Sequence, residues 1–221
     1  MMRGLGSSAI VVVLGFLLSF LSVSAQANVT GVTYSFQHVL EQGEIGTNTD
    51  GAIGEAQLFM GVSDTGSDTL FTFTNTGPFA CSITDVYFSG GGILSSITGI
   101  DNSDPGVLFS EGAAPGNLPG GNAVVPPFTS VLSADSDEPV MTNGVNPGES
   151  LGIAFDLVSG YLYTDVIDSL CDGSLRVGLH VQGYEDGGSE SFTNNIPAPG
   201  ACGMAAIGIG IVNWLRRRRT L

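Results

Sequence analysis

The chain has 221 residues and carries 21 acidic against six basic residues, a net charge of -15, with no lysine. All of the acidic residues lie between Glu41 and Glu190, and the only basic residue in that stretch is Arg176. A surface with so few cations repels nucleic acid and anionic lipid head groups, so the composition excludes nucleic-acid partners. It attracts divalent cations, and it is also typical of an exported protein that charge keeps soluble.

The N-terminus has the three parts of a secretory signal peptide. Arg3 supplies a positive charge, residues 9–21 are apolar, and Ala25-Gln26-Ala27 is a small-x-small cleavage site. We therefore expect the secretion translocon and signal peptidase to process residues 1–27. Residues 28–195 then form the mature body, which is one domain by length and long enough to bury a core.

The body is predicted to consist of short strands joined by Gly, Asn, Asp and Pro turns. Apolar and polar residues alternate in 32–38, 151–157 and 175–181. Further strand candidates are 56–63, 70–76, 83–89 and 93–100. Such closely spaced strands predict an all-β fold, an antiparallel β-sandwich or jelly roll.

One segment favours a helix, which we expect to pack across one end of a sheet. Thr164 can cap its N-terminus, Asp165 and Asp168 suit its first turns, and Gly173 can end it. The regular pattern stops between Glu111 and Pro127, where 17 residues include four glycines and four prolines. Such a long excursion is either a binding loop or a plain Ω-loop.

Two acidic turns are candidate calcium sites, because calcium takes six to eight oxygen ligands from flexible turns. The first contains Asp101 and Asp104, and the second contains Asp135, Asp137 and Glu138. Neither has the twelve-residue spacing of an EF-hand, so the alternative is a pair of solvated turns. No other cofactor is expected.

Catalytic motifs are not found in the sequence. His38 and His180 are the only histidines, and each lies at an alternating position of a predicted strand, where a hydrogen-bonded sheet residue is the ordinary role. There is no Gly-x-Ser-x-Gly elbow and no His-Glu-x-x-His helix. We therefore expect no enzyme, and a secreted hydrolase is only a remote alternative.

The chain has three cysteines, Cys81, Cys171 and Cys202. In an oxidising compartment Cys81 and Cys171 can form a disulfide, which would close a long loop and stabilise the body by roughly 4–5 kcal/mol. The alternative is that both are buried thiols that behave as small apolar side chains.

The C-terminal stretch, residues 196–221, has three parts. It begins with a break at Pro197, Ala198, Pro199 and Gly200, continues with an uncharged run over residues 201–215, and ends with the arginines Arg216, Arg217, Arg218 and Arg219. As a helix the uncharged run would span roughly 22 Å, less than a hydrocarbon core of about 30 Å. The arginine cluster would stay on the cytoplasmic side and stop transfer.

This order of break, short apolar helix and arginine cluster resembles the PEP-CTERM sorting tail. The resemblance covers the last 26 residues, and it departs from the pattern at Ala198, where the usual residue is Glu. It implies that an exosortase in the inner membrane recognises and cuts the tail, in a Gram-negative host that makes exopolysaccharide. The alternative is a simple C-terminal anchor that is never cut.

Together these features predict an exported surface or extracellular-matrix protein whose body has a structural or adhesive role. Its expected partners are the exosortase, the translocon, signal peptidase and exopolysaccharide, and its final location is the cell surface or the medium. The competing hypothesis is a calcium-dependent carbohydrate-binding module, with the acidic turns and the loop from Glu111 to Pro127 lining its site.

Overall fold

The computed structural model describes residues 31–40, 43–90 and 92–196. The strands of this part are β1 (Val32–His38), β2 (Leu58–Asp64), β3 (Thr69–Asn75), β4 (Ser82–Gly90), β5 (Leu94–Asp101), β6 (Phe109–Glu111), β7 (Ser130–Ser136), β8 (Ser150–Leu157), β9 (Leu175–Gln182) and β10 (Ser189–Asn194). The helices are α1 (Thr49–Gln57), α2 (Val140–Asn143), α3 (Tyr163–Asp172) and a 3-10 turn, η1 (Gly121–Ala123).

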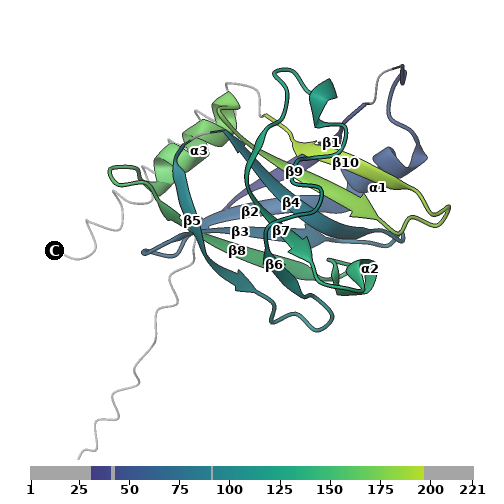
Figure 1. Ribbon diagram of the computed structural model, residues 1–221, viewed down its shortest axis with the longest axis horizontal. Coiled ribbons are helices and arrows are strands. Elements are labelled where there is room, and N and C mark those ends of the chain that lie inside the picture. The colour runs from purple at the N-terminus through teal and green to yellow at the C-terminus, as the bar shows by residue number, and fades with distance from the viewer. Residues whose placement is uncertain (1–30, 41–42, 91, 197–221) are drawn as a thin grey trace, which may run out of the picture.

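All ten strands belong to one antiparallel sheet with the order β5-β8-β3-β2-β1-β10-β9-β4-β7-β6. The sheet wraps around a common interior until its first and last strands approach each other (Figure 1). The Asn102 side chain bridges this seam, because its amide donates to the Phe109 carbonyl at 3.1 Å and its oxygen accepts from the Phe109 N–H at 2.9 Å. The antiparallel β prediction is confirmed, in the form of one nearly closed sheet.

The interior is filled by apolar side chains from both halves of the wrapped sheet. Phe71 of β3, Phe88 of β4 and Phe155 of β8 meet edge to face, with ring centroids 4.6–5.4 Å apart. This geometry stabilises an aromatic cluster beyond the area that it buries. Because β3 and β8 lie on one side of the sheet order and β4 on the other, the cluster joins the two halves.

Helix α1 closes one end of the wrapped sheet. It begins after Asn48, whose side-chain oxygen accepts from the Gly51 N–H at 2.7 Å. Gly51 and Gly54 face His38 and Phe192, and a Cβ at Gly54 would lie 2.1 Å from the Phe192 ring. The two glycines therefore allow the helix to approach the sheet closely, although glycine lowers helix propensity.

Helix α3 is the one that the sequence predicts. Val166, Ile167 and Leu170 are buried, and Gly173 ends the helix in the left-handed conformation with φ 78°. Its start differs from the prediction: the N-cap is Leu162, not Thr164, and the Asp165 side chain accepts from the Leu162 N–H at 2.8 Å. Among the described residues, no helix has the length and apolar character needed to cross a membrane.

Six of the predicted strands agree with the observed ones to within a residue or two, namely 32–38, 70–76, 83–89, 93–100, 151–157 and 175–181. The prediction of a strand over 56–63 is wrong at its start, because Ala56 and Gln57 end α1. The sequence analysis also missed α1, α2, β6, β7 and β10. The signal peptide, the sorting motif from Pro197 to Gly200 and the arginine cluster lie outside the described residues.

Candidate functional site

The Gly- and Pro-rich loop, residues 112–129, lies across the outer face of the sheet (Figure 1). Its side chains Leu118 and Phe128 form a small buried cluster with Tyr87 of β4 and with Val39. They can pack so closely because Gly178 of β9 lies beneath them, where a Cβ would be 2.9 Å from the Leu118 side chain. The loop is therefore part of the packed body.

Arg176 fastens the end of this loop. Its guanidinium donates to the Pro126 carbonyl and, at 2.9 Å, to the Pro127 carbonyl, and it lies 5.3 Å from the centre of the Phe128 ring. Burial lowers the pKa of the guanidinium, although it stays charged at neutral pH. The one basic residue between Glu41 and Glu190 is thus used to hold the fold.

Two further side chains fix the start and the middle of the loop. The Tyr87 hydroxyl donates to the Pro115 carbonyl at 2.9 Å. The Asn117 amide donates to the Phe128 carbonyl at 3.1 Å, and its oxygen accepts from the Ser130 N–H at 2.9 Å. These hydrogen bonds hold the segment in place as a compact Ω-loop, which is one of the two alternatives that the sequence leaves open.

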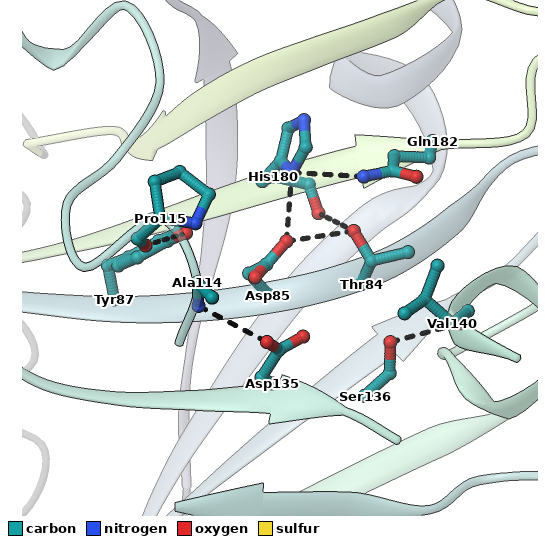
Figure 2. Close-up of polar contacts among 10 residues, drawn as sticks. All are labelled: Thr84, Asp85, Tyr87, Ala114, Pro115, Asp135, Ser136, Val140, His180 and Gln182. Atoms are coloured by element: carbon teal, nitrogen blue, oxygen red, sulfur yellow. Dashed lines mark hydrogen bonds and ion pairs between the residues drawn. The ribbon is translucent and has the colours of Figure 1, made fainter. Parts of the chain in front are cut away.

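A row of polar side chains runs across three neighbouring strands beside this loop (Figure 2). His180 of β9 lies opposite Asp85 of β4, and Asp85 lies opposite Asp135 of β7. A β-bulge between Ile83 and Asp85 shifts the alternation of β4, so that Asp85 joins this row while Ile83 stays in the core.

Asp85 is the centre of the row, and only 3% of it is exposed. Its Oδ2 accepts from His180 Nδ1 at 2.8 Å and from the Thr84 hydroxyl at 3.0 Å. In the tautomer with the proton on Nδ1, His180 donates this bond to the carboxylate. The other oxygen, Oδ1, is buried and no donor of the described residues reaches it.

Asp135 supplies the second carboxylate of the row. Its side chain accepts from the Ala114 N–H at 3.2 Å, which connects the row to the start of the loop. Burial, followed by the negative charge of Asp85, raises the pKa of Asp135 above its ordinary value of 3.8.

The geometry of the row determines its chemistry. In a hydrolytic triad the carboxylate orients one nitrogen of the histidine, and the nucleophile lies at the other. Here Asp85 orients His180, but the Thr84 hydroxyl donates to the same carboxylate, on the wrong side of the ring. The second nitrogen of His180 points away from the network (Figure 2). The row joins β9, β4 and β7, and through Ala114 it holds the loop.

We expect the change Asp135→Asn to stabilise the protein by about 1 kcal/mol at pH 7, because the new amide can donate to the unpaired Oδ1 of Asp85. The pH dependence has a definite sign. A raised pKa means that the folded state holds the proton more tightly, so the wild type gains stability as the pH falls through the raised pKa, until it levels off below 3.8. The advantage of the variant should therefore shrink towards pH 4.

Urea unfolding at pH 7, 5.5 and 4 measures this difference. Asp156→Asn is the matched control, because Asp156 is exposed on β8 and loses the same charge away from the row. An advantage of Asp135→Asn that is the same at all three pH values would contradict the raised pKa of Asp135.

Arg176→Lys is expected to cost about 1–2 kcal/mol although it keeps the charge, because an ammonium cannot serve both proline carbonyls and the Phe128 ring in one geometry. The loop should become the first site of proteolytic cleavage. Limited proteolysis with mass mapping, together with thermal unfolding, measures both effects. An unchanged cleavage pattern would mean that the Leu118 and Phe128 contacts hold the loop by themselves.

The predicted calcium ligands fall into separate places. Asp101 accepts from the Ser103 N–H at 3.0 Å and so closes its own turn. Asp104 accepts from the Ser150 N–H at 2.8 Å, which ties its loop to the start of β8. Asp135 belongs to the row with Asp85. Asp137 and Glu138 follow β7, where their carbonyls accept from the Asn143 amide. In the part of the chain that the structure describes, no three or more His, Cys, Asp or Glu side chains form a metal-binding group.

His38 also binds a carboxylate, as the hydrogen-bonded role predicts. Its Nε2 lies 2.7 Å from Glu190 of β10, and the other oxygen of Glu190 accepts from the Asn48 amide at 2.7 Å. The His38 N–H donates to Glu55 of α1 at 2.9 Å. Both histidines therefore join strands to their neighbours.

The predicted Cys81–Cys171 disulfide is wrong. Cys81 is a free thiol, 2% exposed, and its sulfur accepts from the Gln57 amide at 3.0 Å. Burial raises the pKa of this thiol, so it stays protonated and unreactive. Cys171, at the end of α3, is disulfide-bonded, and Cys202 lies outside the described residues.

Comparison of the chain with protein-family models, with curated proteins and with solved structures gives no match in any of the three. The row of Asp85, Asp135 and His180 was not predicted as a unit. Its signal in the sequence is the broken alternation of β4, where Ile83 and Val86 are both apolar with two polar residues between them.

Proposed function

We propose that this protein is an exported component of the cell surface or extracellular matrix, and that its β body acts by binding or by structure and not by catalysis. A signal peptide starts its export, and the C-terminal tail holds it briefly in the inner membrane by a short helix before an exosortase cuts it. In this view exopolysaccharide is the material among which the mature body resides.

The observation that carries this proposal is the order of the last 26 residues. A proline break, an uncharged run too short to span a membrane comfortably, and four arginines act together only if the tail is held with the body outside. The last strand, β10, ends at Asn194, so the break at Pro197 follows directly after the folded body.

One feature of the body supports the proposal. The groups most suited to chemistry, namely Asp85, His180 and Arg176, all make contacts that hold strands or the loop in place. A body whose reactive side chains are used in this way is suited to a structural or adhesive role.

Intact mass of the mature protein from its native host tests the delivery. We expect a species that has lost the signal peptide near Ala27 and the tail near Pro199. A matched variant in which Pro197 and Pro199 are both alanine should keep the tail, because the break is then absent. Wild-type mature protein that still contains Trp214 and the arginines would overturn the proposal.

Calcium binding stays a prediction. A test of calcium binding distinguishes the structural role from a calcium-dependent carbohydrate-binding module. Thermal melting of the mature protein with calcium and with chelator is the measurement. A calcium shift of several degrees that Asp104→Asn abolishes would favour the module, because ligand binding to the folded state raises its stability. Equal melting curves are expected for the structural role.

A further inference from the structure

A cavity of about 410 Å³ opens beside the N-terminal turn of α1. Its wall combines α1, the segment between β3 and β4, and the turn between β9 and β10. The lining residues are Thr49, Asp50, Ile53, Phe79, Ala80, Glu185 and Asp186. The volume lies in the range of small-molecule sites, and the wall has both apolar and acidic side chains.

Phe79 is an exposed aromatic residue of this wall, and packing in the core does not explain its position. Its side chain is 57% exposed, whereas most phenylalanines of the described residues are buried. Its backbone is nevertheless held on both sides by buried Gln57, which accepts from the Phe79 N–H at 3.2 Å and donates to the Phe79 carbonyl at 2.9 Å. An exposed ring on a fixed backbone is a preorganised contact surface, and preorganisation lowers the entropic cost of binding.

The charge of the cavity restricts its ligand. Three of its lining residues are carboxylates and none is basic. Asp50 and Asp186 approach each other around Gly188, whose N–H donates to Asp186 at 2.8 Å. Burial and then the negative charge of Asp186 raise the pKa of Asp50, because the charged form of Asp50 is disfavoured beside a second carboxylate. A cation between the two carboxylates would relieve their repulsion.

We propose that this cavity binds a primary alkylammonium group, as carried by a polyamine or by a lysine side chain. The ammonium lies between Asp50 and Asp186, the face of Phe79 contributes a cation–π contact, and the alkyl stem packs on Ile53 and Ala80. The aromatic and apolar wall favours an organic cation over a bare metal ion, which prefers a cage of oxygens. The site does not depend on the tail being cut.

The test is titration of the isotope-labelled mature protein with 1,5-diaminopentane, followed by NMR. We expect saturable shifts confined to residues 49–53, 79–80 and 185–186. Asp186→Asn and Phe79→Ala should each weaken binding about fivefold, which corresponds to roughly 1 kcal/mol. Asn at position 186 can still accept from the Gly188 N–H, so the turn is preserved.

Asp156→Asn is the control, because Asp156 follows Phe155, which lies opposite Thr69 at the far end of β3 from Phe79. Equal weakening by Asp156→Asn would overturn the proposal in favour of diffuse charge attraction. Equal binding of 1,5-pentanediol or of neutral sugars would overturn it in favour of a saccharide site. An N-acetylated lysine amide that binds as well as the diamine would identify a protein partner as the source, and a clear preference for the diamine would identify a polyamine.

Discussion

Gly54→Ala is expected to destabilise the protein by about 3 kcal/mol, because the new methyl group would lie 2.1 Å from the Phe192 ring. This change in stability has the opposite sign to that of most Gly→Ala substitutions in helices. Glycine to alanine in a helix normally stabilises by up to about 1 kcal/mol, since alanine has the higher helix propensity. Chemical unfolding of the purified variant measures the free energy, and α1 should also leave the end of the sheet, which hydrogen exchange detects.

Two further variants make the result specific to the contact between α1 and β10. Ala56→Gly changes an exposed residue of the same helix and should cost no more than about 1 kcal/mol. Combining Gly54→Ala with Phe192→Leu should recover part of the loss, because the smaller side chain makes room for the methyl group. A neutral or stabilising Gly54→Ala would mean that α1 does not pack as closely as described.

Asn75→Asp is expected to have the other large effect, a loss of about 3–5 kcal/mol at pH 7. Asn75 is fully buried, and its amide donates to the carbonyls of Cys81 at 2.9 Å and Val145 at 3.3 Å. The carboxylate has the same shape but no proton to give, so a negative oxygen would face two carbonyl oxygens without water. Urea unfolding measures the loss, which should shrink at low pH as the new carboxyl gains a proton.

Asn146→Asp is the matched control, because it makes the same chemical change at a residue that is less buried than Asn75. Its amide also donates to two carbonyls, those of Thr142 and Gly144, but it is only half-buried. Water can reach the new carboxylate there, so the loss should be about 1 kcal/mol or less. Similar losses for the two variants would show that the local bonds, and not desolvation, decide the cost.

The alternation of apolar residues predicted those strands whose inner face is apolar, such as β8 and β9. It failed for β10, where Phe192 is the one large apolar side chain and the inner position of Asn194 is filled by an amide that accepts from the Val177 N–H at 2.7 Å. It also failed for α1, because Gly51 and Gly54 lower its helix propensity and only the tertiary contacts with His38 and Phe192 explain them.

The polar sites were harder to predict than the strands, because they depend on which strands become neighbours. Asp85, Asp135 and His180 are up to 95 residues apart and meet only through the register of β4, β7 and β9. The cavity beside α1 depends on a helix that the pattern did not show. The cysteine prediction failed because pairing follows three-dimensional proximity, and Cys81 is already a hydrogen-bond acceptor inside the core.

The seam that Asn102 bridges affects how the protein behaves at high concentration. An edge strand with unpaired backbone N–H and C=O groups can pair with a strand of another molecule, and this pairing is a common route to aggregation. In this protein β5 and β6 face each other, and the Asn102 amide occupies backbone groups of Phe109 that an incoming strand would need. At high protein concentration, copies of this protein can therefore touch through their side chains without joining their sheets.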